Sequence, residues 1–230
     1  VPTPMHERWQ ADSASLKVAV MPTIDCLPIF VAADRGLFGQ AGVSVSLYPY
    51  DAQMDCDTAL TAGWVDGMFT DLVRSERLTG QGVALNRYFS TGLYWQLLTA
   101  KSARIKQVSQ LDDRMVAMTR YSATALLTDL LVDSAKLVSD RVFRIQVNDV
   151  GIRLSMMANN VMDAMLLPEP QATVARQMGC GVVYDSRQSD LRLGVMVFTE
   201  KALQDTLRSR QAEAFAQVYD MAFDSLNERG

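Results

Sequence analysis

The chain has 230 residues, of which 49% are hydrophobic and 21% are charged, and its formal net charge is -4. At this length roughly 70 to 75% of the unfolded surface can be buried on folding, so a core can form without disulfide staples. The acidic balance and the scatter of the 22 Lys and Arg residues exclude a nucleic-acid partner, because phosphate binding needs clustered basic side chains.

The first part of the chain predicts strands that alternate with helices. Strands are expected at residues 16–20, 43–47, 65–69, 83–89 and 94–100, and helices at residues 29–38, 55–61 and 72–79. This alternation is typical of a largely parallel sheet that is covered by helices on both faces.

The same pattern starts again after a loop at residues 101–113. Strands are expected at residues 115–119, 142–147, 162–167, 182–184 and 193–198, and helices at 122–134, 150–157, 170–177, 200–207 and 210–227. We therefore predict an α/β fold of two lobes, each a mixed, mostly parallel sheet flanked by helices. The expected first lobe is discontinuous, with residues 15–100 and 191–230, and the second lobe comprises residues 101–190.

An internal echo supports two lobes of similar construction. Residues 62–68 (AGWVDGM) and 159–165 (NNVMDAM) each join a helix to an apolar strand, with an Asp just before the strand. Gly63 and Asn160 hold matching positions, and both residue types suit the left-handed backbone at the C-terminus of a helix. The echo indicates duplicated lobes.

The sequence has no stretch that approaches the roughly 20 uninterrupted apolar residues of a membrane-spanning helix. The first 15 residues are polar and rich in Pro, without the basic-then-apolar pattern of a signal peptide. We expect that a leader, if one exists, has been removed from this numbering.

Four loops that follow predicted strands are the candidate ligand site, since ligands of open α/β sheets bind beyond the carboxyl ends of the strands. The candidate ligand-binding residues in these loops are Thr23, Ile24, Asp25, Phe69, Thr70, Asp71, Arg120, Tyr121, Ser122, Ala123, Thr124 and Glu169.

The loop at residues 120–124 is the best candidate for binding an anion. Ser122 or Thr124 can cap the following helix, Arg120 adds a positive charge and Tyr121 offers a stacking face. An ordinary capped helix is the alternative. Asp71 and Glu169 would suit an amine or a ring nitrogen, or they serve as helix caps or surface charges.

Nothing in the sequence predicts catalysis or a metal site. The only histidine, His6, lies in the irregular N-terminal segment, and no GxSxG, HExxH, Walker or GxGxxG pattern occurs. We expect no catalytic residue, no metal ligand and no cofactor. Cys26, Cys56 and Cys180 are expected to be buried thiols, with a disulfide between Cys26 and Cys56 as the alternative.

Several phrases of the sequence resemble one family of binding proteins. Residues 16–47 contain AADRGLF at 32–38 and GVSV at 42–45, and residues 62–67, 111–118 and 162–172 carry further matching elements. These phrases resemble the nitrate, sulfonate, taurine and thiamine-precursor (SsuA-like) family of ABC-transporter substrate-binding proteins. The sequence departs from the family pattern at residues 112–114, which lack a Gly, and at Asn160.

The resemblance implies a periplasmic-binding-protein fold of type 2 that closes like a Venus flytrap on a small organic or anionic molecule in an inter-lobe cleft. It also implies a membrane permease as partner, a monomer, and a periplasmic or extracytoplasmic location, with a lipid anchor through a removed leader as a further expectation. Two alternatives stay open: an enzyme on the same fold, of the pyrimidine-synthase or menaquinone-pathway dehydratase type, or a ligand-sensing module.

Overall fold

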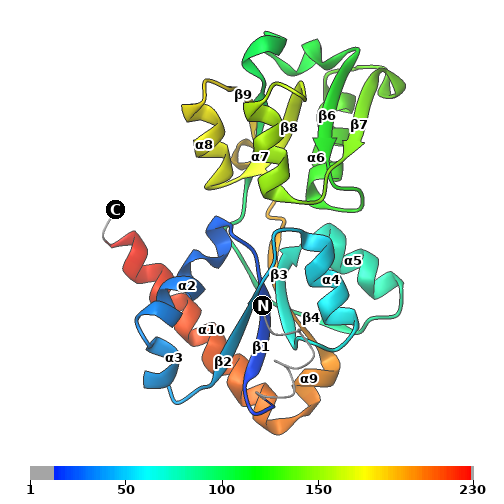
Figure 1. Cartoon of the computed structure of the whole chain (residues 1–230). Coiled ribbons are helices and arrows are strands. Elements are labelled where there is room, and N and C mark those ends of the chain that lie inside the picture. The colour runs from blue at the N-terminus through cyan, green and yellow to red at the C-terminus, as the bar shows by residue number, and fades with distance from the viewer. Residues whose placement is uncertain (1–12, 229–230) are drawn as a thin grey trace, which may run out of the picture. The chain divides into compact units, whose positions relative to one another are not determined.

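The computed structural model describes residues 13–228, which divide into two compact units. Within the described part of the chain, the first unit comprises residues 13–70, 78–91 and 195–228, and the second comprises residues 71–77 and 92–194. His6 lies outside the described residues. Figure 1 follows the chain through its elements by colour.

The first unit is built on a five-stranded sheet with the order β2-β1-β3-β10-β4. Its strands are β1 (Leu16–Val20), β2 (Val45–Pro49), β3 (Gly67–Asp71), β4 (Leu85–Ser90) and β10 (Gly194–Thr199). β1 pairs in parallel with β2 and β3, and β10 pairs antiparallel with β4. Every residue of β1 and β3 is buried, as expected for central strands covered on both faces.

Helices cover both faces of this sheet. They are α2 (Leu27–Asp34), α3 (Leu37–Gln40), α4 (Gln53–Thr61), α9 (Glu200–Gln204) and α10 (Thr206–Asn227). α5 (Leu72–Gly80) is divided, because residues 72–77 belong to the second unit and residues 78–80 to the first. α2, α3 and α10 lie on one side and α4 on the other (Figure 1). Under α10 the core is aromatic: the ring of Phe215 lies 5.8 Å from Phe38, 6.2 Å from Phe69 and 6.0 Å from Phe198.

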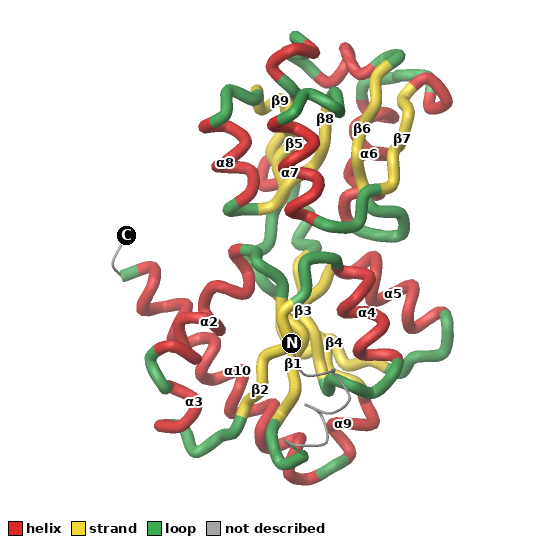
Figure 2. The backbone as a smooth tube through the Cα atoms, in the orientation of Figure 1, coloured by secondary structure: helices red, strands yellow, loops and turns green. Residues whose placement is uncertain are grey.

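The second unit repeats the arrangement with the strand order β7-β6-β8-β5-β9. Its strands are β5 (Trp95–Thr99), β6 (Arg114–Met118), β7 (Val142–Gln146), β8 (Ala164–Pro168) and β9 (Gly181–Asp185), and its helices are α6 (Ala123–Ser134), α7 (Val150–Ala158) and α8 (Gln171–Gln177). β6 is parallel to β7 and β8, and β5 is antiparallel to β8 and β9. Figure 2 shows the strands of each sheet side by side between helices.

Short 3-10 turns complete the structure; they are η1 (Ile24–Cys26), η2 (Lys101–Ala103), η3 (Val108–Leu111), η4 (Ser139–Arg141) and η5 (Ser186–Gln188). Within the described residues, no helix is both long enough and apolar enough to cross a membrane. The mixed α/β fold class predicted from the sequence is therefore confirmed, with two five-stranded sheets flanked by helices.

The internal echo corresponds to the same backbone conformation and the same kind of hydrogen bond in both units. Gly63 and Asn160 both have positive φ, at 75° and 54°. Asp66 accepts a hydrogen bond from the backbone N–H of Lys17 at 2.9 Å, and Asp163 accepts one from Met115 at 2.8 Å. The Asp before β3 thus holds the beginning of β1, and the Asp before β8 holds the beginning of β6.

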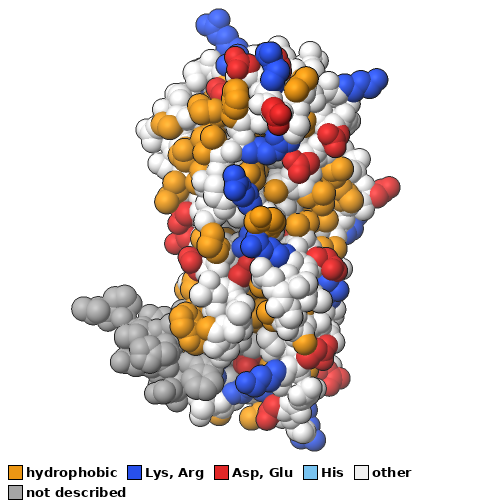
Figure 3. All heavy atoms as spheres, turned by 90° about the vertical axis from the view of Figure 1, so that its right-hand side faces the viewer, with side chains coloured by type: hydrophobic (Ala, Val, Ile, Leu, Met, Phe, Trp, Pro, Cys, Tyr) orange, Lys and Arg blue, Asp and Glu red, His pale blue; other side chains and the backbone are white. Residues whose placement is uncertain are grey.

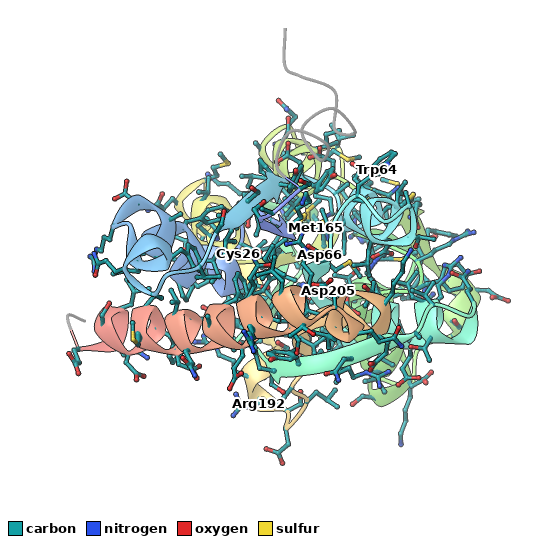
Figure 4. The ribbon with its side chains drawn as sticks, turned by 90° about the horizontal axis from the view of Figure 1, so that it is seen from below. Cys26, Trp64, Asp66, Met165, Arg192 and Asp205 are labelled. Atoms are coloured by element: carbon teal, nitrogen blue, oxygen red, sulfur yellow. The ribbon has the colours of Figure 1, made fainter. Side chains whose placement is uncertain are left out.

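Charge surrounds the first of these aspartates. Arg208 lies 3.5 Å from Asp66 and also donates to the backbone oxygen of Ala14 at 2.9 Å. Burial raises the pKa of Asp66 above its ordinary value, although the Lys17 N–H and the Arg208 charge oppose the shift. Figure 4 labels Asp66 and Asp205 near the N-terminal half of α10, the helix that carries Arg208.

The structure corrects the expected lobe boundaries. β5 was expected in the first lobe, but it pairs with β8 and β9 of the second sheet, and β10 is the corresponding insertion into the first sheet. The boundaries between the units lie at residues 70/71, 77/78, 91/92 and 194/195, rather than at residues 100/101 and 190/191. A strand's choice of partner depends on contacts distant in sequence, which local patterns do not contain.

Two smaller expectations also change. The single helix expected at residues 29–38 is interrupted at Gly36, whose φ of 66° ends α2 and starts the short α3. Cys26 and Cys56 are buried as expected, but Cys180 is only half-buried, and the three cysteines form no disulfide. Burial raises the pKa of the Cys26 thiol well above its ordinary value, which makes it a weak nucleophile.

Candidate ligand-binding site

The candidate loops of the first unit lie at one edge of its sheet. The loop with Thr23, Ile24 and Asp25 follows β1, and Phe69 and Thr70 lie at the end of β3. β1 and β3 are adjacent and parallel, so their carboxyl ends reach the same edge. Tyr219 connects the loops, because its hydroxyl donates to the backbone oxygen of Asp25 at 2.9 Å and its ring lies 5.8 Å from that of Phe69.

Asp25 is a buried carboxyl group whose hydrogen bonds, from Thr23 and from the backbone N–H groups of Asp25 and Cys26, do not offset its burial. Its residue is 4% exposed, and the Thr23 hydroxyl donates to its Oδ1 at 2.5 Å. Burial raises the pKa of Asp25 from 3.8 to about 6, against the lowering effect of the Thr23 hydrogen bond. At pH 7 the Asp25 carboxyl is therefore mostly ionised, and it takes up its proton as the pH falls through about 6.

Two buried hydroxyl groups at this edge lack partners. Thr70 is 2% exposed and Thr91, which follows β4, is 6% exposed. Among the described residues, neither hydroxyl oxygen has a hydrogen-bond partner. Buried polar groups are nearly always satisfied, so two open hydroxyls at one edge indicate a place for a ligand or for ordered water.

Asp71 is the last residue of β3 and serves as a helix cap. It is 5% exposed, and its Oδ1 accepts a hydrogen bond from the backbone N–H of Arg74 at 2.9 Å. This is the cap role that the sequence offered as the alternative for Asp71.

In the second unit, the loop at residues 119–124 builds a closed network of hydroxyl groups. Ser122 caps α6: its Oγ accepts from the Thr124 N–H at 3.2 Å and donates to the Thr119 oxygen at 2.6 Å. The Thr119 N–H in turn donates to Oγ1 of Thr124 at 3.0 Å. The hydroxyls of Ser122 and Thr124 thus hold the loop in place, as in an ordinary capped helix.

Arg120 and Tyr121 lie beside a cavity of about 500 Å³ whose lining includes Met118, Arg120, Tyr121, Ser122, Ala125, Leu126, Asp129 and Arg144. Its volume falls in the range of small-molecule sites. Tyr121 is 58% exposed and its φ is 57°, a left-handed conformation that is unusual for an aromatic residue. Arg144 forms an ion pair with Asp129 at 2.8 Å, which leaves the charge of Arg120 as the more available one.

Glu169, which follows β8, has its charge satisfied within the unit. Its Oε1 accepts from Arg176 at 3.0 Å, and its Oε2 accepts from the Thr173 N–H at 2.9 Å. Burial raises the pKa of Glu169, but the hydrogen bonds from Thr173 and Arg176 outweigh it, and the net pKa is below the ordinary value. A carboxylate held in this way is a poor partner for an additional amine.

The Glu169–Arg176 pair belongs to a larger polar cluster. Arg176 also donates to Gln96, and the amide of Gln96 donates to Asp185 at 2.7 Å. Arg187 holds the pKa of Asp185 down to about 2. The Arg187 guanidinium also lies 4.0 Å from the centroid of the Tyr94 ring.

The structure therefore brings the candidate residues together within each unit, at strand-end edges of the sheets. Sequence reasoning missed Thr91 and Tyr219, for which no local signal existed. Within the part of the chain that the structure describes, no group of His, Cys, Asp and Glu residues could hold a metal ion.

Charged side chains are interspersed on the surface. On the face that Figure 3 shows, Lys and Arg alternate with Asp and Glu without forming a large patch of one sign.

No protein-family model and no curated protein sequence matches the chain. Solved structures do match. The alkanesulfonate-binding protein SsuA from Xanthomonas axonopodis, bound to MOPS, has a TM-score of 0.79 at 15% identity, over 94% of this chain and 75% of that one.

Two further matches carry different descriptions. A ligand-binding component of an ABC-type import system from Staphylococcus aureus has a TM-score of 0.78 at 16% identity, over 90% of this chain and 73% of that one. A gene product of Candida albicans, described as having the generic periplasmic binding protein fold, has a TM-score of 0.69 at 15% identity, over 93% and 72%. The chain therefore has the periplasmic binding protein fold, in a form similar to that of SsuA.

Proposed function

We propose that this chain is an extracytoplasmic solute-binding protein that presents a small organic or anionic molecule to the permease of an ABC importer. The proposed ligand contacts are the strand-end residues described above, from each unit. In this proposal the protein works as a monomer, needs no cofactor and binds no nucleic acid.

The observation that carries the proposal is the state of the polar groups at the strand ends. Thr70 and Thr91 are buried and lack partners among the described residues, and Asp25 is buried with a raised pKa. In open α/β folds these edges are the usual place of the ligand. Groups that lack partners in the protein are suited to bind a solute, which would complete their hydrogen bonds.

The matches support this proposal at the level of fold. SsuA from Xanthomonas axonopodis is described as an alkanesulfonate-binding protein, and the Staphylococcus aureus protein as the ligand-binding component of an import system. A solute-binding role needs only binding and conformational response, which require no catalytic residue.

A thermal-shift screen tests the proposal. The panel contains nitrate, taurine, alkanesulfonates, hydroxymethylpyrimidines, thiamine and aromatic carboxylates, and each compound is recovered and analysed by mass spectrometry. A compound at 100 times its Kd adds about 2.7 kcal/mol of stability, which for a chain of this size corresponds to a rise in Tm of roughly 5 to 10 °C. A shift with the compound recovered unchanged supports binding; chemical conversion would instead support the enzyme alternative, and no shift with any compound counts against the proposal.

The variant Thr70→Val tests whether the buried Thr70 hydroxyl, which lacks a partner among the described residues, binds the ligand. Valine has nearly the shape of threonine, so the unliganded protein should keep its stability or gain some, because an unsatisfied buried hydroxyl disappears. Affinity for the compound found in the screen should fall roughly 3- to 10-fold. Thr61→Val, at an exposed position at the end of α4, is the matched control and should change neither quantity. Equal affinity in Thr70→Val and wild type would remove Thr70 from the site.

A further inference from the structure

A second cavity lies in the first unit, at the edge of the sheet where β1 and β3 begin. Its volume is about 570 Å³, and its lining includes Leu60, Val65, Asp66, Lys201, Asp205 and Arg208, all of which belong to the first unit. This volume is within the range of small-molecule sites. The cavity is distinct from the strand-end edge described above, because β3 separates Asp66 from Thr70 by roughly 13 Å.

Asp66 contributes an accessible carboxylate oxygen to this cavity. Its Oδ2 accepts a hydrogen bond from the Lys17 N–H at 2.9 Å and lies 3.5 Å from Nε of Arg208. Among the described residues, its Oδ1 has no hydrogen-bond partner. The Asp66 side chain is 17% exposed, and Oδ1 is not one of the polar atoms that are closed to solvent, whereas the Thr70 hydroxyl is. A molecule in the cavity can therefore reach Oδ1 of Asp66.

The matching aspartate of the second unit uses both of its oxygens. Oδ2 of Asp163 accepts from the Met115 N–H at 2.8 Å, and its Oδ1 lies 3.8 Å from the Arg114 guanidinium. In both units the oxygen that holds the beginning of a strand is Oδ2. This structural role therefore does not account for the second oxygen of Asp66, which the cavity leaves open.

The positive charge nearest to Asp66 is engaged by the protein itself. Arg208 donates hydrogen bonds to the backbone oxygens of Ser13 and Ala14. It also donates to Oε1 of Gln211 at 2.8 Å, and its Nε faces Oδ2 of Asp66. The guanidinium thus has partners on every nitrogen and serves to hold the chain beside the cavity.

Two further charged groups of the lining are less engaged. Lys201, in α9, is exposed and forms no ion pair with any residue that the structure describes. Asp205 caps α10, because its Oδ1 accepts from the Arg208 N–H at 2.9 Å. The charge of Asp205 also raises the pKa of Asp66, and Figure 4 labels the two aspartates close together. The cavity therefore offers an ammonium group on one side and carboxylate oxygens on the other.

We propose that this cavity binds a small zwitterion with an aliphatic body, such as an apolar amino acid. The ammonium group of the ligand donates to Oδ1 of Asp66, and its carboxylate pairs with Lys201. Leu60 and Val65, which are each 2% exposed, provide an apolar wall for the aliphatic part. A zwitterion preserves the balance of two acidic and two basic groups in the lining, which a ligand of a single charge would disturb. This site does not depend on the proposed function.

The experiment titrates the protein by calorimetry with three zwitterions, L-leucine, L-valine and 5-aminopentanoate. Two matched compounds each lack one charge of L-leucine: 3-methylbutylamine lacks the carboxylate, and 4-methylpentanoate lacks the ammonium group. At least one zwitterion should bind wild type, and L-leucine should bind at least about tenfold more tightly than either matched compound, since hydrogen bonds between charged groups are the strong ones.

Variants assign each charge of the ligand to its partner. Asp66→Asn keeps an oxygen for the Lys17 N–H but should lose roughly 10-fold in affinity for L-leucine, and should no longer prefer it to 4-methylpentanoate. Lys201→Met should lose roughly 3- to 10-fold and should no longer prefer L-leucine to 3-methylbutylamine. Asp163→Asn is the matched control: it makes the same change at the equivalent strand of the second unit and should leave all affinities unchanged.

The possible results decide between a ligand site and an ordinary surface cleft. The inference is overturned if no zwitterion binds wild type, if the matched compounds bind as tightly as L-leucine, or if Asp66→Asn keeps full affinity. An equal loss in Asp66→Asn and Asp163→Asn would assign Asp66 a structural role only. A zwitterion whose binding is weakened by Thr70→Val and not by Asp66→Asn would occupy the strand-end edge instead. None of these results removes the proposed function, which the separate screen and Thr70→Val test.

Discussion

Replacement of Asp25 by asparagine should change how the stability of the protein depends on pH. Asp25 is buried, and its pKa is raised from 3.8 to about 6 because burial disfavours the charged carboxylate. The folded protein therefore binds a proton at Asp25 more tightly than the unfolded chain does.

The sign follows from linkage. Between the unfolded and the folded pKa, the folded state carries more protons, so the free energy of unfolding falls as the pH rises through this interval and levels off above it. The size of the shift, from 3.8 to about 6, corresponds to ~3 kcal/mol between the two plateaus. The amide introduced by Asp25→Asn cannot titrate, and its oxygen can still accept the hydrogen bond from Thr23.

The assay is urea unfolding of wild type and Asp25→Asn at pH values from 4 to 8. Other groups titrate in both proteins, so the informative quantity is the difference in unfolding free energy between them. We expect Asp25→Asn to gain stability relative to wild type as the pH rises, by up to ~3 kcal/mol at pH 8. Asp34→Asn, at an exposed position of α2, is the control variant. A constant difference for Asp25→Asn, or a loss that grows with pH, would refute the reasoning.

Two further predictions concern the framework of the sheets. Asp66→Ala should cost about 2 kcal/mol of unfolding free energy and Asp163→Ala about 1 kcal/mol, measured by urea unfolding, because the first hydrogen bond is more buried than the second; equal costs would contradict the role of burial. Gly67→Ala should cost several kcal/mol, since a Cβ there would lie 2.5 Å from the Phe198 ring, whereas Gly80→Ala in α5 meets no atom within 4 Å and should be neutral or stabilising by up to ~1 kcal/mol. A similar Tm for the two glycine variants would show that the core near β3 adjusts to the added methyl group without loss of stability.

The elements were predictable where the pattern is local. The first strand was expected at residues 16–20 and occurs there, because its apolar run is short and bounded by turn residues. The echo also predicted left-handed backbone at Gly63 and Asn160, which the structure confirms. These features depend on a few neighbouring residues, which the sequence displays directly.

Pairing between distant strands was not predictable in this way. The apolar run at residues 94–100 looks like any other buried strand, and only its partners β8 and β9 decide that it belongs to the second sheet. The equivalent place in the first sheet is filled by β10, from the other end of the chain. β5 and β10 each pair with strands that are distant in the sequence. A division of the chain by sequence order therefore assigns β5 to the wrong unit.

The positions of the candidate loops were predictable from the sequence. The hydrogen-bond partners of their side chains were not. Strand-end loops are recognisable from the alternation of strands and helices, so Thr23 and Arg120 could be named. Whether a polar group finds a partner depends on the folded surroundings: Glu169 is neutralised by Arg176, whereas Thr91 and Arg153 are left open among the described residues. That ligand contacts occur at these loops remains a prediction.

The satisfied and the open polar groups make opposite contributions to the stability of the protein. Ser122 and Thr124 complete one another's hydrogen bonds and hold a loop, so their contribution is to stability. Thr70 and Arg153 are buried without completing their bonds within the described chain, and each costs stability that an apolar residue would not. In the proposed function, a molecule bound at the strand-end edge of the first unit would complete the hydrogen bonds of Thr70 and offset that cost. Thr70→Val should therefore raise or preserve the stability of the unliganded protein while it weakens binding.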